Sequence, residues 1–427
     1  MNTTQRVVFL LFGLSLTAGI VSGNVLYYRL TYLWGFLILV SWLMSFISLR
    51  GVQFSRSART LRSQVGQIFE EQYDIRNTGR LPRLWIEVSD ESNLPGTRGS
   101  HVLTMIGGRE SRSYLARTRL TERGVFPLGP TIIGSGDLFG MFPVNRTIKN
   151  QESLLVYPMI VSVKDFPNPP GLLPGGEALR RRTPQITPNA SGIREYSPGD
   201  PLNRIHWIST ARRNRIIVKE FELDPLADVW IFLDAARAVQ VDQPVPEPVI
   251  EPQDIWRRKF KYSLPPSTLE YAVSSAGSLS RYYLQKGRAV GLVSAGPSMR
   301  IIPGDRGGRQ LGKILEALAI IKGEGTLPLH GLVEAQARHL PRGSTAVLIT
   351  PSASESVYKV ADLLLRRGLR PVVVLIHAAT FGGTQENQAI EFSLRSLGIP
   401  VCQVDCGVDL ASSLETILSV QNRSLVA

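Results

Sequence analysis

The sequence predicts a multidomain fold with an N-terminal transmembrane α-hairpin, a β-rich sandwich-like region and a C-terminal α/β domain of the doubly wound, Rossmann-like type. Three observations predict it. Two apolar runs free of charge stand near the N-terminus, short strands separated by turn residues follow, and strands then alternate with helices. The expected boundaries are 1–50 for the hairpin, 62–160 for the β-rich domain, 161–225 for a signature or linker region and 226–427 for the α/β domain.

The N-terminal runs are Val7–Val21, which Ser22–Leu26 extends, and Tyr32–Leu49. Each is close to the ~20 residues that a helix needs to cross a bilayer. A cleaved signal peptide is the alternative for the first run. The second run follows within a few residues, and no clear small-x-small cleavage site leads into a soluble domain, so two spans are favoured.

The distribution of arginines orients the hairpin. The connecting loop holds only Arg29, whereas Arg6 precedes the first run and Arg50, Arg56, Arg59 and Arg62 follow the second. Because positive residues stay on the cytoplasmic side, both termini are expected in the cytoplasm of a protein of the plasma (inner) membrane. The net charge of +13 suits an anionic membrane surface, and the two cysteines, Cys402 and Cys406, suit a reducing compartment.

The β-rich region consists of short runs such as Gln67–Ile75, Arg83–Val88 and Ser111–Arg119, with Gly and Pro between them. This punctuation is typical of a small sandwich or sheet. The segments 123–130 and 136–142 carry turn-forming Gly and Pro residues. We expect the Phe and Leu residues between them to fill one end of the sandwich, in a structural role.

The segment 192–222 is the richest in polar chemistry. Ser197–Asp200 has Pro and Gly at the positions of a type II turn, and Asp200 followed by proline predicts a helix N-terminus. The helix is expected to run to about Arg212, Asn214 to turn the chain, and Ile216–Phe221 to form a strand.

Two interpretations of its polar residues stay open. One is an Arg–carboxylate network that joins the β-rich region to the next domain. The other is a hydrolytic site that uses Glu195, Asp200 and His206. No spacing matches a triad, a metal motif or a paired-carboxylate site, so the structural or interaction network is favoured, with no catalytic residue assigned. The residues assigned to it are Arg194, Glu195, Tyr196, Pro198, Gly199, Asp200, Arg204, His206, Trp207, Arg212, Lys219 and Glu220.

The same residues resemble a known signature. The runs 194–200, 204–207, 211–212 and 218–222 closely resemble that of the bacterial family called domain of unknown function 58, and the segments 123–130 and 137–142 resemble its upstream β region. The resemblance implies a membrane-anchored protein with a von Willebrand A-like domain, commonly encoded beside MoxR-type AAA+ ATPases and transglutaminase-like membrane proteins. It implies no established activity.

The C-terminal region alternates strands and helices, as a mostly parallel sheet with both faces covered would. The proline-rich segment 240–253 interrupts it as an expected flexible insertion. The expected strands are 228–234, 289–294, 346–350, 371–376 and 400–404, and the expected helices are 268–286, 309–321, 354–367 and 387–397.

Domains of the von Willebrand A type often bind a divalent cation through Asp-x-Ser-x-Ser after the first strand. Here the corresponding residues are Asp234-Ala235-Ala236-Arg237-Ala238, so the acid is present and both hydroxyl positions are alanine. Hard cations need several oxygen ligands. Asp234 is therefore interpreted as a degenerate position, with no metal site and no cofactor expected.

Other motifs favour ordinary structural roles. The run 307–313 matches half of a phosphate-binding loop, but Ile314 replaces the required Ser or Thr. The cysteines have three residues between them rather than two, and no histidines form an i, i+4 pair. The arginines at 180–182 and 212–215 lack interleaved aromatics, so no nucleic-acid partner is expected.

The sequence therefore favours a membrane-anchored, non-enzymatic scaffold or adaptor that binds other proteins through a cytoplasmic module. The resemblance adds a MoxR-type AAA+ ATPase as partner, with a role in assembling envelope proteins. No small-molecule substrate is expected. The alternative is a membrane-bound hydrolase that uses Glu195, Asp200 and His206.

Overall fold

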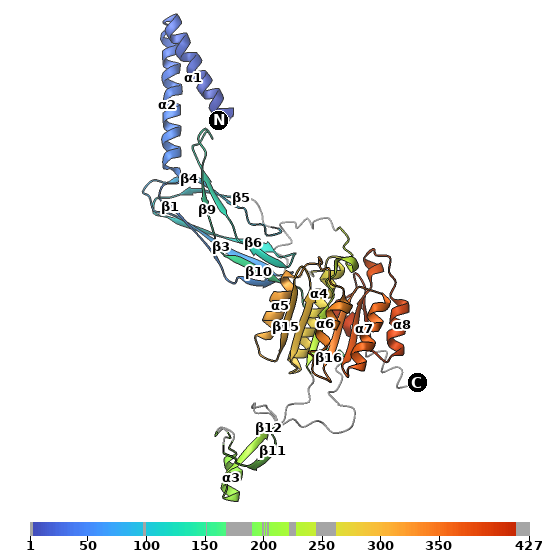
Figure 1. Cartoon of the computed structure of the whole chain (residues 1–427). Coiled ribbons are helices and arrows are strands. Elements are labelled where there is room, and N and C mark those ends of the chain that lie inside the picture. The colour runs from blue at the N-terminus through green and yellow to red at the C-terminus, as the bar shows by residue number, and fades with distance from the viewer. Residues whose placement is uncertain are drawn as a thin grey trace. The chain divides into compact units, whose positions relative to one another are not determined.

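The structure is a computed structural model that describes residues 3–96, 100–150, 152–167, 190–198, 200, 202, 205–221, 228–244 and 262–415. The chain divides into two compact units. The first comprises Met1–Tyr157 with Pro248–Tyr262, and the second comprises Pro158–Glu247 with Ser263–Ala427. Figure 1 traces the elements of both units.

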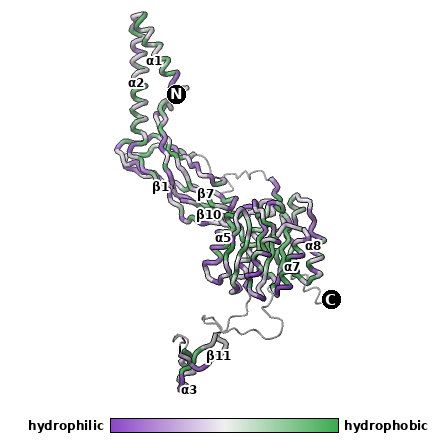
Figure 2. The backbone as a smooth tube through the Cα atoms, viewed as in Figure 1, coloured by the Kyte–Doolittle hydropathy of each residue, from purple (hydrophilic) through white to green (hydrophobic). Residues whose placement is uncertain are grey.

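The first unit begins with two long helices, α1 (Thr3–Ser22) and α2 (Val25–Ser48). Both are long and apolar enough to cross a membrane, and Figure 2 shows how strongly apolar residues dominate them. Asn24 caps α2 by accepting a hydrogen bond from the Leu26 amide at 3.0 Å. The two helices are joined by a hydrogen bond of 3.2 Å from the Thr31 hydroxyl to the Ser15 hydroxyl.

Three small sheets follow the helices in this unit. They have the strand orders β1-β3-β6, β5-β4-β8-β9 and β2-β10-β7. Pairing is antiparallel except between β2 and β10. The strands are β1 (Val52–Ala58), β2 (Arg62–Gln64), β3 (Ile68–Asn77), β4 (Arg83–Asp90), β5 (Ser100–Ile106), β6 (Ser111–Arg119), β7 (Gly124–Pro127), β8 (Thr131–Ser135), β9 (Val144–Ile148) and β10 (Ser153–Tyr157).

A shared core joins the first two of these sheets. Tyr73 and Ile75 of β3 pack in one cluster with Ile86 and Val88 of β4 and Ile133 of β8. Every second residue of β3 is buried, because alternate side chains of a strand point to opposite faces. The β-rich character predicted from the sequence is confirmed. The strands begin at Val52, earlier than the expected boundary at residue 62.

One expectation for this region was wrong in part. Leu128 is buried, as expected of a residue that fills the sandwich end. Leu138 and Phe139, however, are 63% and 51% exposed, whereas Met141 is fully buried. The loop between β8 and β9 turns so that Met141 enters the core while Leu138 and Phe139 face outward.

The second unit contains a six-stranded sheet of order β15-β14-β13-β16-β17-β18. All neighbours are parallel except the edge pair β14 and β15. Its strands are β13 (Val229–Leu233), β14 (Val290–Ala295), β15 (Met299–Asp305), β16 (Thr345–Thr350), β17 (Arg370–Ile376) and β18 (Val401–Val404). The helices are α4 (Thr268–Gln285), α5 (Gln310–Ile320), α6 (Leu329–Ala337), α7 (Glu355–Arg366) and α8 (Gln388–Ser396), with short 3-10 turns η2 (Arg237–Val239) and η3 (Ala378–Phe381).

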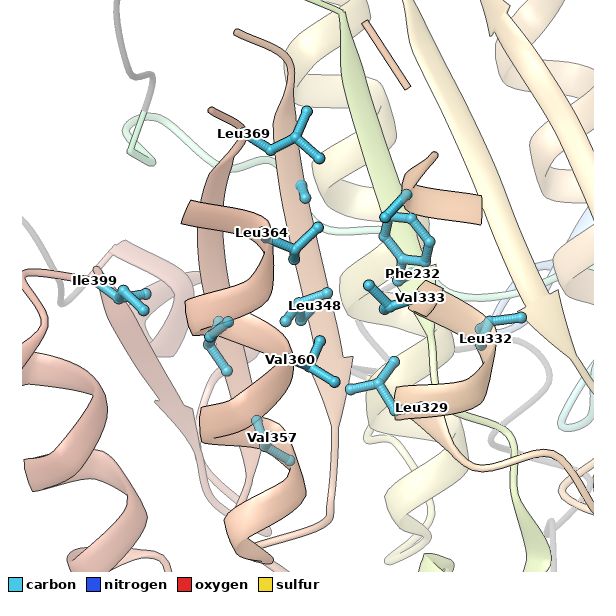
Figure 3. Packing of buried hydrophobic residues seen from close by; sticks show 14 of the residues in the cluster. Phe232, Leu329, Leu332, Val333, Leu348, Val357, Val360, Leu364, Leu369 and Ile399 are labelled. Atoms are coloured by element: carbon cyan, nitrogen blue, oxygen red, sulfur yellow. The ribbon is translucent and has the colours of Figure 1, made fainter. Parts of the chain in front are cut away.

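The strands β14, β16 and β17 are buried almost completely, as parallel strands covered on both faces must be, whereas the antiparallel edge strand β15 is largely exposed. Helices α6 and α7 pack against one another over one face, and their apolar side chains meet those of β13 and β16. Figure 3 shows this packing, with Val333 and Val360 directed toward Phe232 and Leu348. The predicted mixed α/β domain is confirmed.

The start of the expected insertion is part of this fold. Gln240 accepts a hydrogen bond from the Thr268 hydroxyl at 2.8 Å, and the Gln243 amide donates to the Pro266 carbonyl at 3.0 Å. Residues 240–243 are therefore attached to the N-terminal end of α4. The remainder of the predicted flexible insertion, from residue 245, lies outside the described residues.

The second unit also contains a two-stranded antiparallel sheet of β11 (Ala190–Glu195) and β12 (Ile217–Phe221), with α3 (Trp207–Arg213) between them. We call residues 190–221 the signature hairpin.

Candidate functional site

The signature hairpin is held together by backbone pairing and local turns. Glu195 lies opposite Ile217, and Arg194 lies opposite Val218. The Asp200 amide donates to the Ser197 carbonyl at 3.0 Å, which is the hydrogen bond of the predicted turn. Asn214 ends α3 in the left-handed conformation, with φ of 49°, so the predicted reversal of the chain at this residue is confirmed.

The helix in this hairpin starts later than predicted. We expected it to begin at Asp200, but it begins at Trp207 with His206 as its N-cap. The His206 ring nitrogen Nδ1 lies 2.7 Å from the Ser209 hydroxyl and accepts a hydrogen bond from the Ser209 amide at 3.3 Å. Asp200 is not free to cap a helix, because its carboxylate is bonded to Arg194.

Arg194 and Asp200 form the strongest polar contact of the hairpin. The two guanidinium nitrogens donate to the two carboxylate oxygens at 2.7 and 2.6 Å. The Ser197 amide donates to the same carboxylate at 2.9 Å. The Asp200 side chain is 15% exposed and that of Arg194 37%. This bidentate geometry fixes the turn to β11.

The three residues of the hydrolase interpretation each take a different partner. Glu195 forms an ion pair with Arg215, and both side chains are about two-thirds exposed, at 64% and 66%. Asp200 is bonded to Arg194, and His206 to Ser209. The partners described for these three side chains all lie within the hairpin.

The other assigned residues are distributed as follows. Tyr196 is half-buried, and Pro198 and Arg212 are exposed. Lys219 and Glu220 belong to β12, where their backbones pair with Ile193 and Gly192. Gly199 and Arg204 lie outside the described residues.

Sequence reasoning missed the apolar surface of this hairpin. Leu202, Trp207 and Ile208 are 71%, 69% and 65% exposed, and Ile216 is 46% exposed. None of the residues of α3 is buried. The available signal was the composition of α3, where two large apolar residues are followed only by Ala211 and by polar or charged residues, too few to form a buried helical face. Arg212, Arg213 and Arg215 are exposed next to this surface.

A second group of interest lies at the carboxyl end of β13. The order of the sheet reverses between β13 and β16, the position where doubly wound folds place their ligands. Asp234 is 2% exposed there. Its carboxylate accepts hydrogen bonds from the Thr350 hydroxyl at 2.7 Å and the Ala236 amide at 3.2 Å. Burial raises the pKa of Asp234 above its ordinary value.

The hydroxyl chain that continues from Asp234 was not predicted. The Ser352 amide donates to the Thr350 hydroxyl at 3.0 Å, and the Ser352 and Ser354 hydroxyls lie 2.9 Å apart. Among the described residues, no group of three or more His, Cys, Asp or Glu side chains has a geometry that holds a metal ion.

The two cysteines and the run that resembles half of a phosphate-binding loop lie apart from the residues described above. Cys402 is buried and lies 3.0 Å from the Ser413 carbonyl, and burial raises the pKa of its thiol to about 12. Cys406 is partly exposed, and both thiols are free. Lys313 lies on α5, 3.9 Å from Asp305. His377 Nδ1 lies 2.8 Å from the Asp405 carboxylate, and this pair joins the ends of β17 and β18. The sequence did not predict this pair.

Comparison with known proteins supports the family that the signature suggested. Residues 192–242 match the family described as protein of unknown function DUF58. The uncharacterized protein YeaD of Bacillus subtilis (strain 168) is 20% identical over 337 residues, which cover 76% of this chain and 77% of that protein. The family match includes the signature hairpin, the strand β13 and the beginning of the α/β domain.

Solved structures give only weak likenesses. The CARDB domain of the PF1109 protein from Pyrococcus furiosus is 12% identical, covers 25% of this chain and 91% of its own, and has a TM-score of 0.18. The GH20 exo-β-N-acetylglucosaminidase of Vibrio harveyi is 10% identical, covers 81% of this chain and 60% of its own, and has a TM-score of 0.17. Scores this low carry no argument about fold or function.

Proposed function

We propose that this protein is a membrane-anchored, non-enzymatic scaffold or adaptor, whose signature hairpin binds a partner protein on the cytoplasmic side. The single observation that carries the proposal is the exposed apolar surface of Leu202, Trp207, Ile208 and Ile216. Leaving a tryptophan and three other large apolar residues in water is unfavourable for a hairpin of this size. A partner that covers them would remove that surface from water.

The chemistry of this surface is that of a protein-binding site. Tryptophan and arginine are the residue types most enriched among the side chains that dominate binding energies. Trp207 and Ile208 supply the apolar centre, and Arg212, Arg213 and Arg215 supply a basic rim. The rim favours a partner with an acidic face, because complementary charge speeds association and selects the partner.

The polar residues support this proposal rather than the hydrolase alternative. A general base or nucleophile has to be available to a substrate. In the signature hairpin, Asp200 already accepts three hydrogen bonds, and His206 caps α3. These contacts shape the turn and the helix that present the apolar surface.

The C-terminal domain fits a von Willebrand A-like module. Numbered along the chain, its strands have the doubly wound order 3-2-1-4-5-6, with the third strand antiparallel. Asp234 stands at the end of the first strand, where the resemblance places the acid of a cation site. Here that acid is closed off by Thr350, which suits a module that binds protein without a cation.

The membrane anchor is formed by α1 and α2. Their length and composition meet the requirement of a bilayer. Arg6 lies in the first turns of α1, and Arg50, Arg56, Arg59 and Arg62 follow α2. In this proposal both termini are cytoplasmic and the protein resides in the plasma membrane. The partner is a MoxR-type AAA+ ATPase, which comes from the family resemblance, and the pair would act in the assembly of envelope proteins.

A crosslinking pull-down from membranes tests the proposal. The tagged chain is compared with a Trp207→Ser, Ile208→Ser variant, and with Phe392→Ser as a matched control, since Phe392 of α8 is 78% exposed. We expect the native chain and the control to capture an AAA+ ATPase that the double variant loses. Equal capture by all three would exclude the hairpin as the binding site, and the absence of any AAA+ ATPase would exclude this partner.

A further inference from the structure

The loop between β8 and β9 is a rigid structure with an apolar tip. Asp137 is 2% exposed, and its carboxylate accepts hydrogen bonds from three backbone amides of the same loop. These are Phe139 at 3.0 Å, Met141 at 3.2 Å and Phe142 at 2.7 Å. Gly140 closes the turn with φ of 67°. The loop therefore has a fixed shape, and the exposure of its tip is a property of that shape.

The tip consists of Leu138 and Phe139, which are 63% and 51% exposed. Met141, two residues later, is fully buried and anchors the loop to the β-rich region. Two adjacent large apolar side chains on a loop held in place by three hydrogen bonds are costly in water. An apolar environment outside the protein would remove this surface from water.

The loop is attached to α2 near the end of its apolar run. The Ser45 hydroxyl donates a hydrogen bond of 2.5 Å to the Phe142 carbonyl. Between loop and helix lies a hollow of about 480 Å³. It is lined by Gln5 of α1, by Trp42, Ser45 and Phe46 of α2, and by Phe142, Pro143 and Val144. Figure 1 shows the connection between β8 and β9 beside the lower part of α2.

The position of Ser45 along α2 sets the depth of the loop. At 1.5 Å per residue, the helix from Val25 to Ser45 rises about 30 Å, the thickness of the hydrocarbon core. If α2 spans the bilayer, Ser45 lies at its cytoplasmic boundary. Trp42 and Phe46 are 51% and 45% exposed there, as aromatic residues at a membrane interface are.

Exposed arginines gather at the same end of the unit. Arg50 follows α2 directly, and its guanidinium lies 3.6 Å from the centre of the Phe46 ring. Arg80 lies in a turn whose Thr78 amide donates a hydrogen bond of 2.8 Å to the Gly51 carbonyl. The Arg109 amide, in the next turn, donates a hydrogen bond of 2.9 Å to the Gly79 carbonyl. All three arginines are exposed, and such a group attracts anionic headgroups.

We propose that the loop Gly136–Phe142 is a second membrane-contacting element, which inserts Leu138 and Phe139 into the interfacial layer of the cytoplasmic leaflet. Arg50, Arg80 and Arg109 contact anionic lipid headgroups beside it. The occupant of the apolar tip is lipid, because the loop that carries the tip is bonded to α2 at Ser45, where the apolar run of that helix reaches the bilayer boundary. The inference rests on the proposed membrane anchor. It adds that the β-rich region itself contacts the bilayer surface through this loop.

Depth-dependent fluorescence quenching in the full-length chain tests this inference. The chain is reconstituted in nanodiscs that contain phosphatidylglycerol and phosphatidylcholine, in a Cys406→Ser background, since Cys402 is buried. A bimane probe is attached at Phe139→Cys, and quenching by lipids that carry a shallow or a deep spin label is compared with quenching by aqueous iodide, the deep label serving the control site in the middle of α2. The control sites are Val125→Cys on β7, which is 52% exposed, and Phe36→Cys within α2, which is 67% exposed.

The expected result is several-fold stronger lipid quenching at position 139 than at position 125, with iodide quenching in the reverse order. Strong lipid quenching at position 36 together with none at position 139 would overturn the inference while the anchor stands. Absence of lipid quenching at both positions 36 and 139 would overturn the anchor and the inference together. Protection of position 139 from both quenchers would mean that protein covers the tip, which also overturns the inference.

Discussion

The guanidinium of Arg194 and the carboxylate of Asp200 face one another in a bidentate pair, with hydrogen bonds of 2.7 and 2.6 Å. The pair closes the turn that connects β11 to the segment preceding α3. The pair thereby fixes the position of the segment that leads into α3, which carries the exposed side chains of Trp207 and Ile208. The densest group of charges in the sequence serves, in this account, to shape an apolar surface.

The first prediction concerns this pair. Asp200→Ala removes the acceptor of three hydrogen bonds and leaves Arg194 without its main partner. We expect the hairpin to lose about 1–2 kcal/mol of local stability, within the range for charge-assisted bonds at partly exposed sites. Hydrogen exchange of the β11 and β12 amides measures it.

Glu195→Ala is the matched control, because its pair with Arg215 is largely exposed and surface pairs contribute little. Exchange rates in β11 and β12 should change little in this variant. Equal acceleration in both variants would show that Arg194–Asp200 has no special structural role.

The second prediction concerns the buried network of the β-rich region. Arg56 donates to Glu71 at 2.7 and 2.9 Å and to Asp90 at 3.0 Å through both of its terminal nitrogens. The side chains of Arg56 and Glu71 are 4% and 3% exposed. Arg56→Met leaves two carboxylates unpaired in the core, which is expected to cost about 3–5 kcal/mol.

Chemical unfolding of the full chain in detergent measures this loss. The triple variant Arg56→Met, Glu71→Gln, Asp90→Asn removes the charges together and should recover most of it. A triple variant as unstable as the single one would mean that packing of Arg56, rather than charge, accounts for the loss.

The third prediction concerns pH and Asp234. Burial raises the pKa of this carboxyl in the folded protein, so the folded state holds its proton more tightly than the unfolded state. The stabilising contribution is complete below the ordinary carboxyl pKa and is lost as pH rises through the raised value. Asp234→Asn, which carries no titrating charge, should therefore raise the thermal midpoint at neutral pH, and the gain should shrink toward acidic pH.

Scanning calorimetry at a series of pH values checks this, with Asp242→Asn as an exposed control in the same unit. A destabilised Asp234→Asn variant at neutral pH would show that the carboxylate itself is needed. Stabilisation of the native chain by Mg²⁺ that the variant lacks would show that Asp234 binds a cation.

The sequence predicts best those helices and strands whose formation depends on a short, continuous run of apolar residues. The helices α4, α5, α7 and α8 and five strands of the α/β sheet follow from apolar runs of helix or strand length, and the structure places them within a few residues of the predicted ranges. The strand β15 was missed because Pro303 and Gly304 interrupt it. As an antiparallel edge strand it tolerates proline.

The candidate site was predictable only in part. The residues of the signature and the turn at Ser197–Asp200 could be read from their types and spacing. Their pairing could not, because the sequence places Asp200 before a proline, where helix capping and ion pairing with Arg194 are both reasonable. Tertiary packing determines which apolar side chains stay exposed, and the local sequence pattern does not specify that packing. This applies to Trp207, Ile208, Leu138 and Phe139.

The fourth prediction separates the scaffold from the hydrolase. His206→Ala removes the cap of α3 and, in the scaffold account, changes no chemical activity. Purified native and variant chains should hydrolyse ester, amide and phosphoester substrates at the same background rate. A hydrolysis that the native chain catalyses and a correctly folded His206→Ala variant has lost would establish the hydrolase instead.

The most direct test of the central claim is photo-crosslinking at the apolar surface of the signature hairpin. A photoreactive phenylalanine analogue replaces Ile208, or Phe392 as the control, and membranes are irradiated before purification. The account predicts a single major adduct between position 208 and an AAA+ ATPase, absent from position 392. An adduct of position 208 with another segment of the same chain would contradict it, because the surface would then be covered within the protein.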